Sequence, residues 1–152
     1  MIVGVDPGKT GALVLLDTPV IIDYMDMPYQ DKLVNGQELF EMLMFWKNIY
    51  GVTEACVEQV GSRPQQGVVS TFTFGVSYGI VIGALQAALF DITFVRPQVW
   101  KKALELSSDK DDSRQMAIRL WPDNIDDFAR KKDDGRAEAA LIALWKEEYS
   151  GN

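Results

Sequence analysis

Short apolar runs alternate with turn-forming residues over the first part of the chain. Residues 2–6 and 12–16 form two such runs, and the Pro, Gly and Thr residues within 7–11 are typical of a tight turn between them. A third run covers residues 19–25, and the Met-Pro pair and polar residues of 27–35 indicate a loop. The pattern predicts three consecutive strands, of which the first two form a β-hairpin.

A helical pattern then replaces the extended one. From Gln37 onward, large apolar residues recur at spacings of three and four, and Gly51 supplies a stop signal, so we expect a helix over residues 36–50. Residues 52–58 return to an extended pattern and end on a carboxylate. This segment predicts a fourth strand.

A second, longer helix is expected over residues 68–90. Four small residues recur there at a spacing of four and so lie along one face: Gly75, Gly79, Gly83 and Ala87. Another backbone can approach such a face closely. We therefore expect this face to pack tightly, either on the chain's own sheet or on a second copy of the chain.

The rest of the chain predicts one more strand and several helices. The strand covers residues 92–95, and Pro97 follows at a helix start. Asp111 or Asp112 is expected to cap the next helix, which ends before Pro122. A last helix is expected over residues 135–149.

The order of these elements predicts a mixed five-stranded sheet flanked by helices, an α/β fold. The chain has 152 residues, of which 47% are hydrophobic and 24% charged. Both values are ordinary for a folded protein of one domain. We expect residues 1–152 to form that single domain.

Composition also indicates a cellular location. The first residues show no basic segment followed by a long apolar one, so no secretory signal is expected. The longest apolar stretch, residues 75–90, is shorter than a bilayer span and contains polar side chains, so no membrane segment is expected. Cys56 is the only cysteine, which fits the reducing cytoplasm.

The net charge of −7 argues mildly against a protein that binds nucleic acid, because phosphate binding depends on Lys and Arg. The charge is unevenly distributed, however. Ten of the fifteen basic residues lie between 96 and 136, together with nine acidic ones. A local basic surface is therefore compatible with the sequence.

Two carboxylates stand at the ends of apolar strands. Asp6 ends the first strand and Glu58 the fourth, and a buried carboxylate is costly unless a cation compensates it. If these strands are neighbours, the two side chains lie together at one sheet edge. The alternatives are that Asp6 caps the hairpin turn and that Glu58 is solvated at its strand end.

A second pair of carboxylates opens the last helix. Asp134 and Glu138 are four residues apart, so they share one helix face beside small alanines. This arrangement suggests a divalent cation site, although Asp134 as a helix cap is an alternative. The chain has no histidine, which excludes histidine-based triads and histidine-ligated zinc or copper. Carboxylate oxygens favour Mg²⁺ or Mn²⁺.

Together these features resemble the RuvC-type Holliday-junction resolvases of the ribonuclease H-like superfamily. The resemblance rests on Val-Gly-Val-Asp-Pro-Gly at 3–8, Val-Glu at 57–58, the carboxylate pair of the last helix, and the Phe-, Gly- and Tyr-containing segment 72–79. It covers nearly the whole chain. Asp-Gly-Arg-Ala-Glu-Ala at 134–139 is similar to phage-type members, whereas bacterial members place these two acids three residues apart.

The resemblance implies a ribonuclease H-like fold, a homodimer, and paired nicking of four-way or branched DNA with Mg²⁺, for which Mn²⁺ can substitute. Asp6 would bridge two ions ~3.5–4 Å apart, and Glu58, Asp134 and Glu138 would complete their oxygen shells. The cuts would leave 5′-phosphate and 3′-hydroxyl ends. Asp133 is the alternative to Asp134 in this set.

Candidate DNA contacts follow from the same resemblance and from the basic segment. An aromatic side chain could stack on an unpaired base at the junction, and basic side chains could hold phosphates. The candidates are Phe72, Phe74, Lys101, Lys102, Lys132 and Arg136. The phenylalanines could equally belong to the core, and the basic side chains could be solvated helix ends.

Other functions are compatible with the same residues. A ribonuclease H-type enzyme or a general flap nuclease would use the same metal site on another substrate. A protein that binds junctions without cutting them would keep the fold, although the presence of all four acids argues against it.

Overall fold

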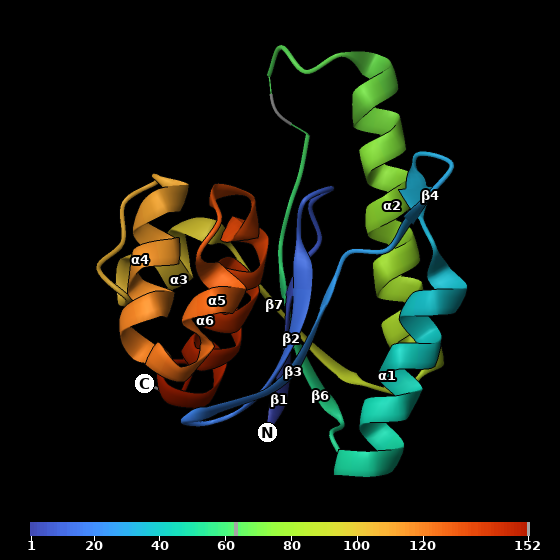
Figure 1. Ribbon diagram of the computed structural model, residues 1–152. Coiled ribbons are helices and arrows are strands. Elements are labelled where there is room, and N and C mark those ends of the chain that lie inside the picture. The colour runs from blue at the N-terminus through green and yellow to red at the C-terminus, as the bar shows by residue number, and fades with distance from the viewer. Residues whose placement is uncertain (63, 152) are drawn as a thin grey trace.

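The computed structural model describes residues 1–62 and 64–151. Its centre is a five-stranded mixed sheet in the order β3-β2-β1-β6-β7 (Figure 1). β1 pairs antiparallel with β2 and parallel with β6, and β7 continues the parallel part. The strands are β1 (Ile2–Asp6), β2 (Ala12–Asp17), β3 (Val20–Asp26), β6 (Glu54–Glu58) and β7 (Asp91–Val95). The predicted α/β class, strand number and mixed pairing are confirmed.

Helices cover both faces of the sheet (Figure 1). On one face lie α1 (Gly36–Tyr50) and α2 (Val68–Ala87), and on the other α3 (Pro97–Ala103), α4 (Lys110–Leu120), α5 (Ile125–Phe128) and α6 (Asp134–Glu148). Successive side chains of β1 point to opposite faces of the sheet. Val3 and Val5 pack against α1 and α2, whereas Ile2 packs against α6. Asp6 lies four residues after Ile2 in the same strand, so its side chain points to the same face of the sheet, toward α6.

α6 packs directly on β1 because glycines remove the side chains that would separate them. A Cβ atom on Gly4 would lie 2.0 Å from the backbone oxygen of Ala139 in α6. A Cβ on Gly135, at the start of α6, would lie 2.0 Å from the backbone oxygen of Thr10 in the β1–β2 turn. The two glycines therefore set the distance between the helix and the strand.

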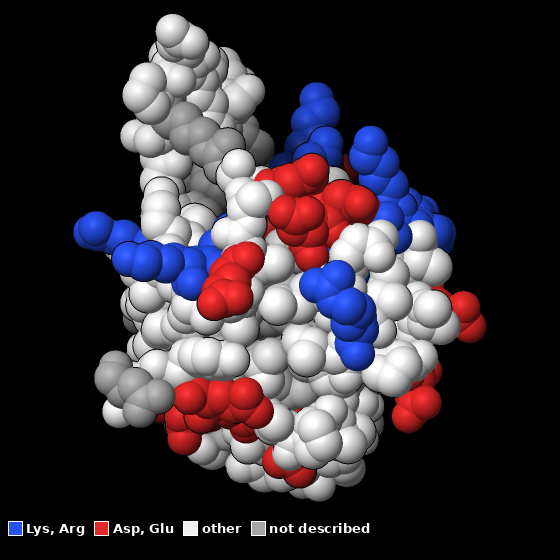
Figure 2. Space-filling view, turned by 90° about the vertical axis from the view of Figure 1, so that its left-hand side faces the viewer, with Lys and Arg blue, Asp and Glu red and all other residues white. Residues whose placement is uncertain are grey.

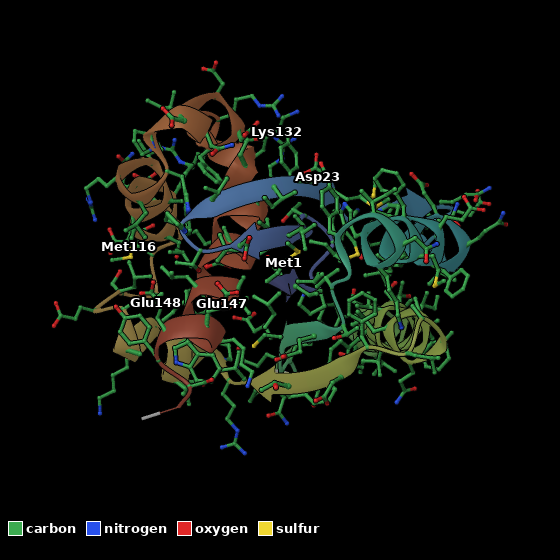
Figure 3. The ribbon with its side chains drawn as sticks, turned by 90° about the horizontal axis from the view of Figure 1, so that it is seen from below. Met1, Asp23, Met116, Lys132, Glu147 and Glu148 are labelled. Atoms are coloured by element: carbon green, nitrogen blue, oxygen red, sulfur yellow. The ribbon has the colours of Figure 1, made fainter. Side chains whose placement is uncertain are left out.

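The far end of α6 is fixed to the start of β1. The amino group of Met1 lies 2.8 Å from Oε1 of Glu147, and both residues are labelled in the view from below (Figure 3). The ion pair holds the pKa of the Met1 amino group above its usual value, chiefly through the hydrogen bond to Glu147. Because α6 runs antiparallel to β1, its N-terminus lies at the end of β1 that carries Asp6.

The small-residue face of α2 does not pack within the chain. All four residues of that face are exposed, and nothing lies within 4 Å of a Cβ built on Gly75, Gly79 or Gly83. The opposite face is buried, through Ser77, Val81, Ala84 and Leu85. Of the two alternatives for this face, packing on the chain's own sheet is therefore wrong.

The N-terminal end of α2 projects beyond the sheet (Figure 1). It carries exposed apolar side chains: Val68 is 85%, Val69 79% and Phe72 74% exposed. By length and composition, α2 is the one helix in the described part of the chain that could cross a membrane. Its buried face belongs to the domain core, where Val81 and Leu85 pack with residues of the sheet.

Several short elements differ from the predicted ones. The expected loop after β3 contains a two-stranded hairpin, β4 (Tyr29–Gln30) and β5 (Leu33–Val34). The cap of α4 is Asp109, whose side chain accepts a hydrogen bond from the backbone of Asp111, so the assignment to Asp111 or Asp112 is wrong. The unassigned segment before α6 forms η1 (Pro122–Asn124), α5 and η2 (Lys131–Asp133).

Candidate active site

The carboxylates predicted from the strand ends lie at one edge of the sheet. β1 and β6 are parallel neighbours with Val5 opposite Val57, so Asp6 and Glu58 follow at the same level. Val5 and Val57 belong to one core and Cys56 to the other, which places Glu58 on the α6 side with Asp6. The N-terminus of α6 adds Asp134 and Glu138. The exposed fractions of Asp6, Glu58, Asp134 and Glu138 are 7%, 8%, 9% and 4%.

Asp6 is costly to ionise in this site. Burial, together with the charges of Glu138 and Glu58, raises its pKa to about 7. The backbone N–H of Gly8 donates to Asp6 Oδ1 at 3.0 Å and partly opposes that rise. The charged form of Asp6 is therefore costly in this site unless a cation stands nearby.

Glu58 is held by a buried tryptophan. The indole Nε1–H of Trp100 donates to Oε1 of Glu58 at 2.8 Å, and Trp100 is fully buried. Burial raises the pKa of Glu58, the bond from Trp100 lowers it, and the charge of Glu138 raises it again. Nothing in the sequence marked Trp100 as more than a core residue.

Two lysines neutralise the α6 carboxylates. Nζ of Lys101 lies 2.7 Å from Oε1 of Glu138, and Nζ of Lys110 lies 2.8 Å from Oδ2 of Asp134. Ser113 Oγ also donates to Glu138, at 3.4 Å. Lys101 was expected to contact DNA, whereas Lys110 and Ser113 were not singled out from the sequence.

Lys110 faces the whole acidic group. Burial alone would lower the pKa of its ammonium group, but the hydrogen bond to Asp134 and the charges of Asp134, Glu138 and Asp6 raise it. The positive charge of Lys110 therefore reduces the mutual repulsion of these three carboxylates, as a bound cation would.

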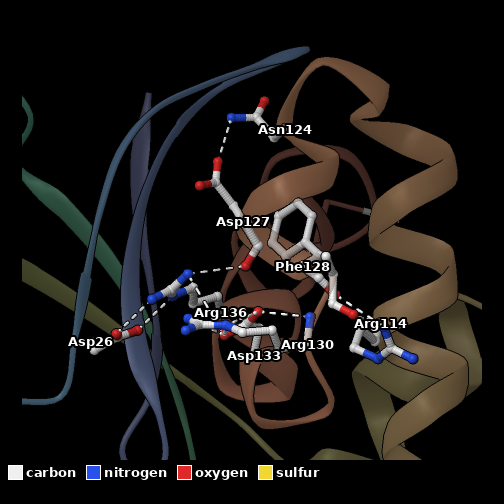
Figure 4. Close-up of polar contacts among 9 residues, drawn as sticks. Asp26, Arg114, Asn124, Asp127, Phe128, Arg130, Asp133 and Arg136 are labelled. Atoms are coloured by element: carbon white, nitrogen blue, oxygen red, sulfur yellow. Dashed lines mark hydrogen bonds and ion pairs between the residues drawn. The ribbon is translucent and has the colours of Figure 1, made fainter.

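Asp133 belongs to a cluster with Arg130 and Arg136 (Figure 4), whereas Asp134 pairs with Lys110. Asp133 is 2% exposed and accepts hydrogen bonds from Arg130, at 2.8 Å from Nη2. Burial would raise the pKa of Asp133, but Arg130 and Arg136 hold it below its usual value. Asp133 therefore anchors the turn before α6, and Asp134 faces Lys110.

Arg136 is also committed to structural contacts. It forms a bidentate pair with Asp26, at 2.6 Å from Nε and 2.7 Å from Nη2 (Figure 4). Its Cζ also lies 4.4 Å from the centroid of the Tyr24 ring. Arg136 is not among the residues that line the acidic cavity. Neither is Lys132, which is exposed in η2 (Figure 3).

The acids line a cavity of about 770 Å³ at the carboxyl ends of β1 and β6. In Figure 2 acidic side chains gather at the base of the projecting part of the molecule, with Lys and Arg beside them. The predicted residues in the cavity wall are Asp6, Glu58, Phe74, Lys101, Lys102 and Glu138. Asp134 reaches the cavity only through Lys110, and Phe72 does not line it.

The donor set fits a divalent cation. In the conformation of residues 1–62 and 64–151, no three acidic or cysteine side chains lie close enough together to hold a metal ion. The ammonium groups of Lys101 and Lys110 instead occupy carboxylate oxygens. Hard oxygen donors and the raised pKa of Asp6 suit Mg²⁺ or Mn²⁺, and binding of an ion would require the lysines to leave the carboxylates and the carboxylates to converge.

Replacing Trp100 with Phe is expected to weaken metal binding without unfolding the protein. Phenylalanine keeps most of the buried ring but removes the only side-chain donor to Glu58 in the described structure. Loss of a hydrogen bond that orients a ligand costs roughly 10–100-fold in metal affinity. Calorimetric titration with Mn²⁺ measures the change in affinity.

A second buried tryptophan provides the matched control for this test. Trp121 is 5% exposed and its indole donates to the backbone oxygen of Pro19, away from the acids. Trp121→Phe should leave Mn²⁺ affinity unchanged. Equal affinity in Trp100→Phe and Trp121→Phe would show that Trp100 only fills the core.

Comparisons with known proteins identify the fold. The sequence matches no protein-family model and has no significant match among curated proteins. Among solved structures, Thermus thermophilus RuvC in complex with a Holliday junction substrate aligns over 99% of this chain and 94% of its own, with 16% identity and a TM-score of 0.68. A second structure of Thermus thermophilus RuvC aligns over 96% and 95%, with 16% identity and a TM-score of 0.61. The chain has the ribonuclease H-like fold of RuvC.

Proposed function

We propose that the protein is a metal-dependent endonuclease that resolves four-way DNA junctions and related branched DNA. The observation that carries the proposal is the cavity in which carboxylates from β1, β6 and α6 meet two lysines. Carboxylates with divalent ions are a common means of hydrolysing phosphodiesters. The likeness to RuvC, whose complex contains a Holliday junction, supports the substrate.

Asp6, Glu58, Asp134 and Glu138 would hold Mg²⁺, as two ions in each site, and Mn²⁺ would substitute. When bound, such ions activate a water molecule and stabilise the leaving oxygen. The charges of Glu58 and Glu138 both act on Asp6, so a bound cation would relieve the electrostatic cost of ionising this carboxylate. No side-chain nucleophile is needed.

The chain's own residues prepare the site for a phosphate. The Gly8 N–H and the Trp100 indole orient Asp6 and Glu58. Lys101 and Lys110 neutralise the acids before substrate arrives, and once displaced from them they can pair with phosphate oxygens. Lys102 lines the same cavity and adds a further positive charge.

Aromatic residues provide a surface for an unpaired base. Phe74 lines the cavity and stacks on Tyr78, with ring centroids 6.5 Å apart and planes within 5°. Phe72 lies two residues before Phe74, nearer the projecting end of α2, and is exposed to solvent. Stacking of an opened base on such a ring contributes roughly 1–3 kcal/mol.

We further propose that the protein acts as a homodimer through α2. The exposed face combines the small residues with Val68, Val69 and Phe72, and a second copy of α2 would cover them. Two sites related by a twofold axis could make paired cuts in a four-way junction. A protein that acts on DNA in this way would work in the cytoplasm of a bacterial cell or of a phage-infected host.

Replacing Gly79 with Arg is expected to convert the dimer to a monomer. Gly79 has open space around its Cβ position, so the isolated chain can accommodate the side chain, whereas a close helix pair cannot. Sedimentation equilibrium measures the change in mass. A control, Ser70→Arg, adds the same charge at an exposed position on the side of α2 opposite the small-residue face. A monomeric wild-type protein would contradict the proposal.

Incubation with labelled DNA tests the proposed activity. The substrates are a four-way junction, a matched duplex, a flap and an RNA–DNA hybrid, each with Mg²⁺ or with EDTA. Symmetric, Mg²⁺-dependent nicks in the junction would support a resolvase. Preferential cutting of the hybrid or the flap would favour the alternative nucleases, and junction binding without cleavage would indicate a non-catalytic binding protein.

A further inference from the structure

A second cavity adjoins the acidic one. It has a volume of about 510 Å³ and lies between the end of β6 and the start of α3. Five residues line both cavities: Glu58, Val60, Phe74, Pro97 and Gln98. The two cavities are therefore neighbouring parts of one surface depression, with the ring of Phe74 at their boundary.

The walls of the two cavities differ in chemistry. The first carries Asp6, Glu58, Glu105 and Glu138 together with three lysines, which suits cations and phosphate. The second carries Glu58 as its one acid among the lining residues, and Arg96 as its one cation. Its remaining polar groups are mostly amides, which suits a neutral ligand that offers both donors and acceptors.

Two of these amides are available for binding. The side chains of Gln59 and Gln98 make no hydrogen bond to any residue in the described part of the chain. An amide presents one acceptor and two donors, so it can pair with the edge of a nucleobase, as Gln does with adenine. Gln98 is exposed in the first turn of α3, where it borders both cavities.

We propose that the second cavity binds one unpaired nucleobase of the strand being cut, and that Gln98 reads the edge of this base. The inference rests on the proposed nuclease function. A phosphate in the acidic cavity and a base in the second cavity would belong to neighbouring positions of one strand, since the cavities share a wall. Phe74 stacks on the base at that boundary.

Branched DNA suits this arrangement better than duplex DNA does. A base inside a duplex must be unpaired and unstacked before it can enter a cavity, and this cost is smallest where pairing is already interrupted. The crossover of a junction supplies such bases. Binding of an unpaired base in this cavity would therefore make the enzyme prefer branched DNA over duplex DNA and would also make cleavage depend on the identity of that base.

Cleavage of a junction series tests the inference. The junctions differ only in the base at each position within two nucleotides of the cut. Wild-type protein should prefer one base at one position by about tenfold, the effect expected of a bidentate amide contact. Gln98→Ala should remove most of that preference by slowing cleavage of the preferred junction, while Gln115→Ala, on the exposed surface of α4 and outside both cavities, should retain it.

Two results would overturn the inference while leaving the nuclease function intact. One is equal cleavage of all the junctions by wild-type protein. The other is an unchanged base preference in Gln98→Ala. Gln98 is exposed, so its replacement should not impair folding, and circular dichroism confirms this for each variant.

A binding measurement separates failure of this inference from failure of the proposed function. A junction with 2-aminopurine beside the crossover is titrated with protein in EDTA, where no cleavage occurs. The emission should change on binding to wild-type protein and change by less than half as much on binding to Phe74→Ala. An unchanged signal despite binding would overturn the base site even if no variant cuts DNA, and absence of any junction binding would overturn both proposals.

Discussion

Asp6→Asn is expected to lower junction cleavage by more than about 100-fold while leaving junction binding within a few-fold of wild type. The amide keeps the shape of the side chain but loses the charge that a divalent cation requires. The cavity lysines remain in place, so phosphate binding persists. Single-turnover cleavage with Mg²⁺ and gel-shift binding in Ca²⁺ measure the two effects separately.

The same substitution is expected to stabilise the metal-free protein. The pKa of Asp6 is raised to about 7 in the folded state, so the folded protein favours its protonated form. This contribution to stability is present below the unfolded pKa, near 4, and is lost as the pH rises through about 7. In EDTA at pH 8, Asp6→Asn should therefore melt several degrees above wild type, and the difference should shrink toward pH 4.

Asp17→Asn provides the matched control for both measurements. Asp17 is an exposed aspartate at the end of β2, away from the cavity. Its replacement should change neither cleavage nor the pH dependence of melting by a comparable amount. Full cleavage by Asp6→Asn would remove Asp6 from the mechanism, and a lower melting temperature in EDTA at pH 8 would contradict the electrostatic account of the site.

Gly135→Ala is expected to be nearly as damaging as loss of a carboxylate. The added Cβ would meet the backbone oxygen of Thr10 at 2.0 Å, and backbone atoms cannot rotate away as a side chain can. The N-terminus of α6 must move, and Asp134 and Glu138 move with it. We expect a loss of stability of about 1–3 kcal/mol and a fall in cleavage of at least about 100-fold.

Melting and cleavage assays on one set of variants separate these effects. Gly151→Ala, at a position with open space, should behave as wild type in both. Cleavage by Gly135→Ala should remain low even at a temperature where the variant is fully folded, because the acids stay displaced. Restoration of cleavage under folding conditions would mean that Gly135 affects stability alone.

The sequence predicted those parts of the site that follow from local pattern. Asp6 and Glu58 end apolar strands, and the spacing of Asp134 and Glu138 places them on one helix face. The structure places Asp6, Glu58 and Glu138 in the wall of one cavity and connects Asp134 to it through Lys110. Their role as metal ligands stays a prediction until a metal titration tests it.

The partners of these acids could not be predicted in the same way. Trp100 and Glu58 are 42 residues apart in sequence, and the Ser113–Glu138 contact spans 25. Such contacts depend on how α3 and α4 pack against α6. A tryptophan in an amphipathic helix is typical of a core residue, and a lysine at a helix start is typical of a solvated one.

The small-residue face of α2 shows a second limit of sequence reasoning. Periodicity identifies which residues share a face but not what covers that face. The hairpin of β4 and β5 was missed for a different reason. Its strands have two residues each, and its turn places Asp31 and Lys32 at positive φ without the Asn-Gly signal typical of such turns.

The close approach of α6 to β1 gives a means of recognising distant relatives. Any chain that brings its last helix this near to its first strand must keep a residue without a Cβ at the positions of Gly4 and Gly135. Each glycine lies within a few residues of a site carboxylate, in the pattern Gly-x-Asp in the strand and Asp-Gly-x-x-Glu in the helix. A search that requires both patterns, with the strand first, would select for architecture and chemistry at once where overall identity has fallen too low to detect.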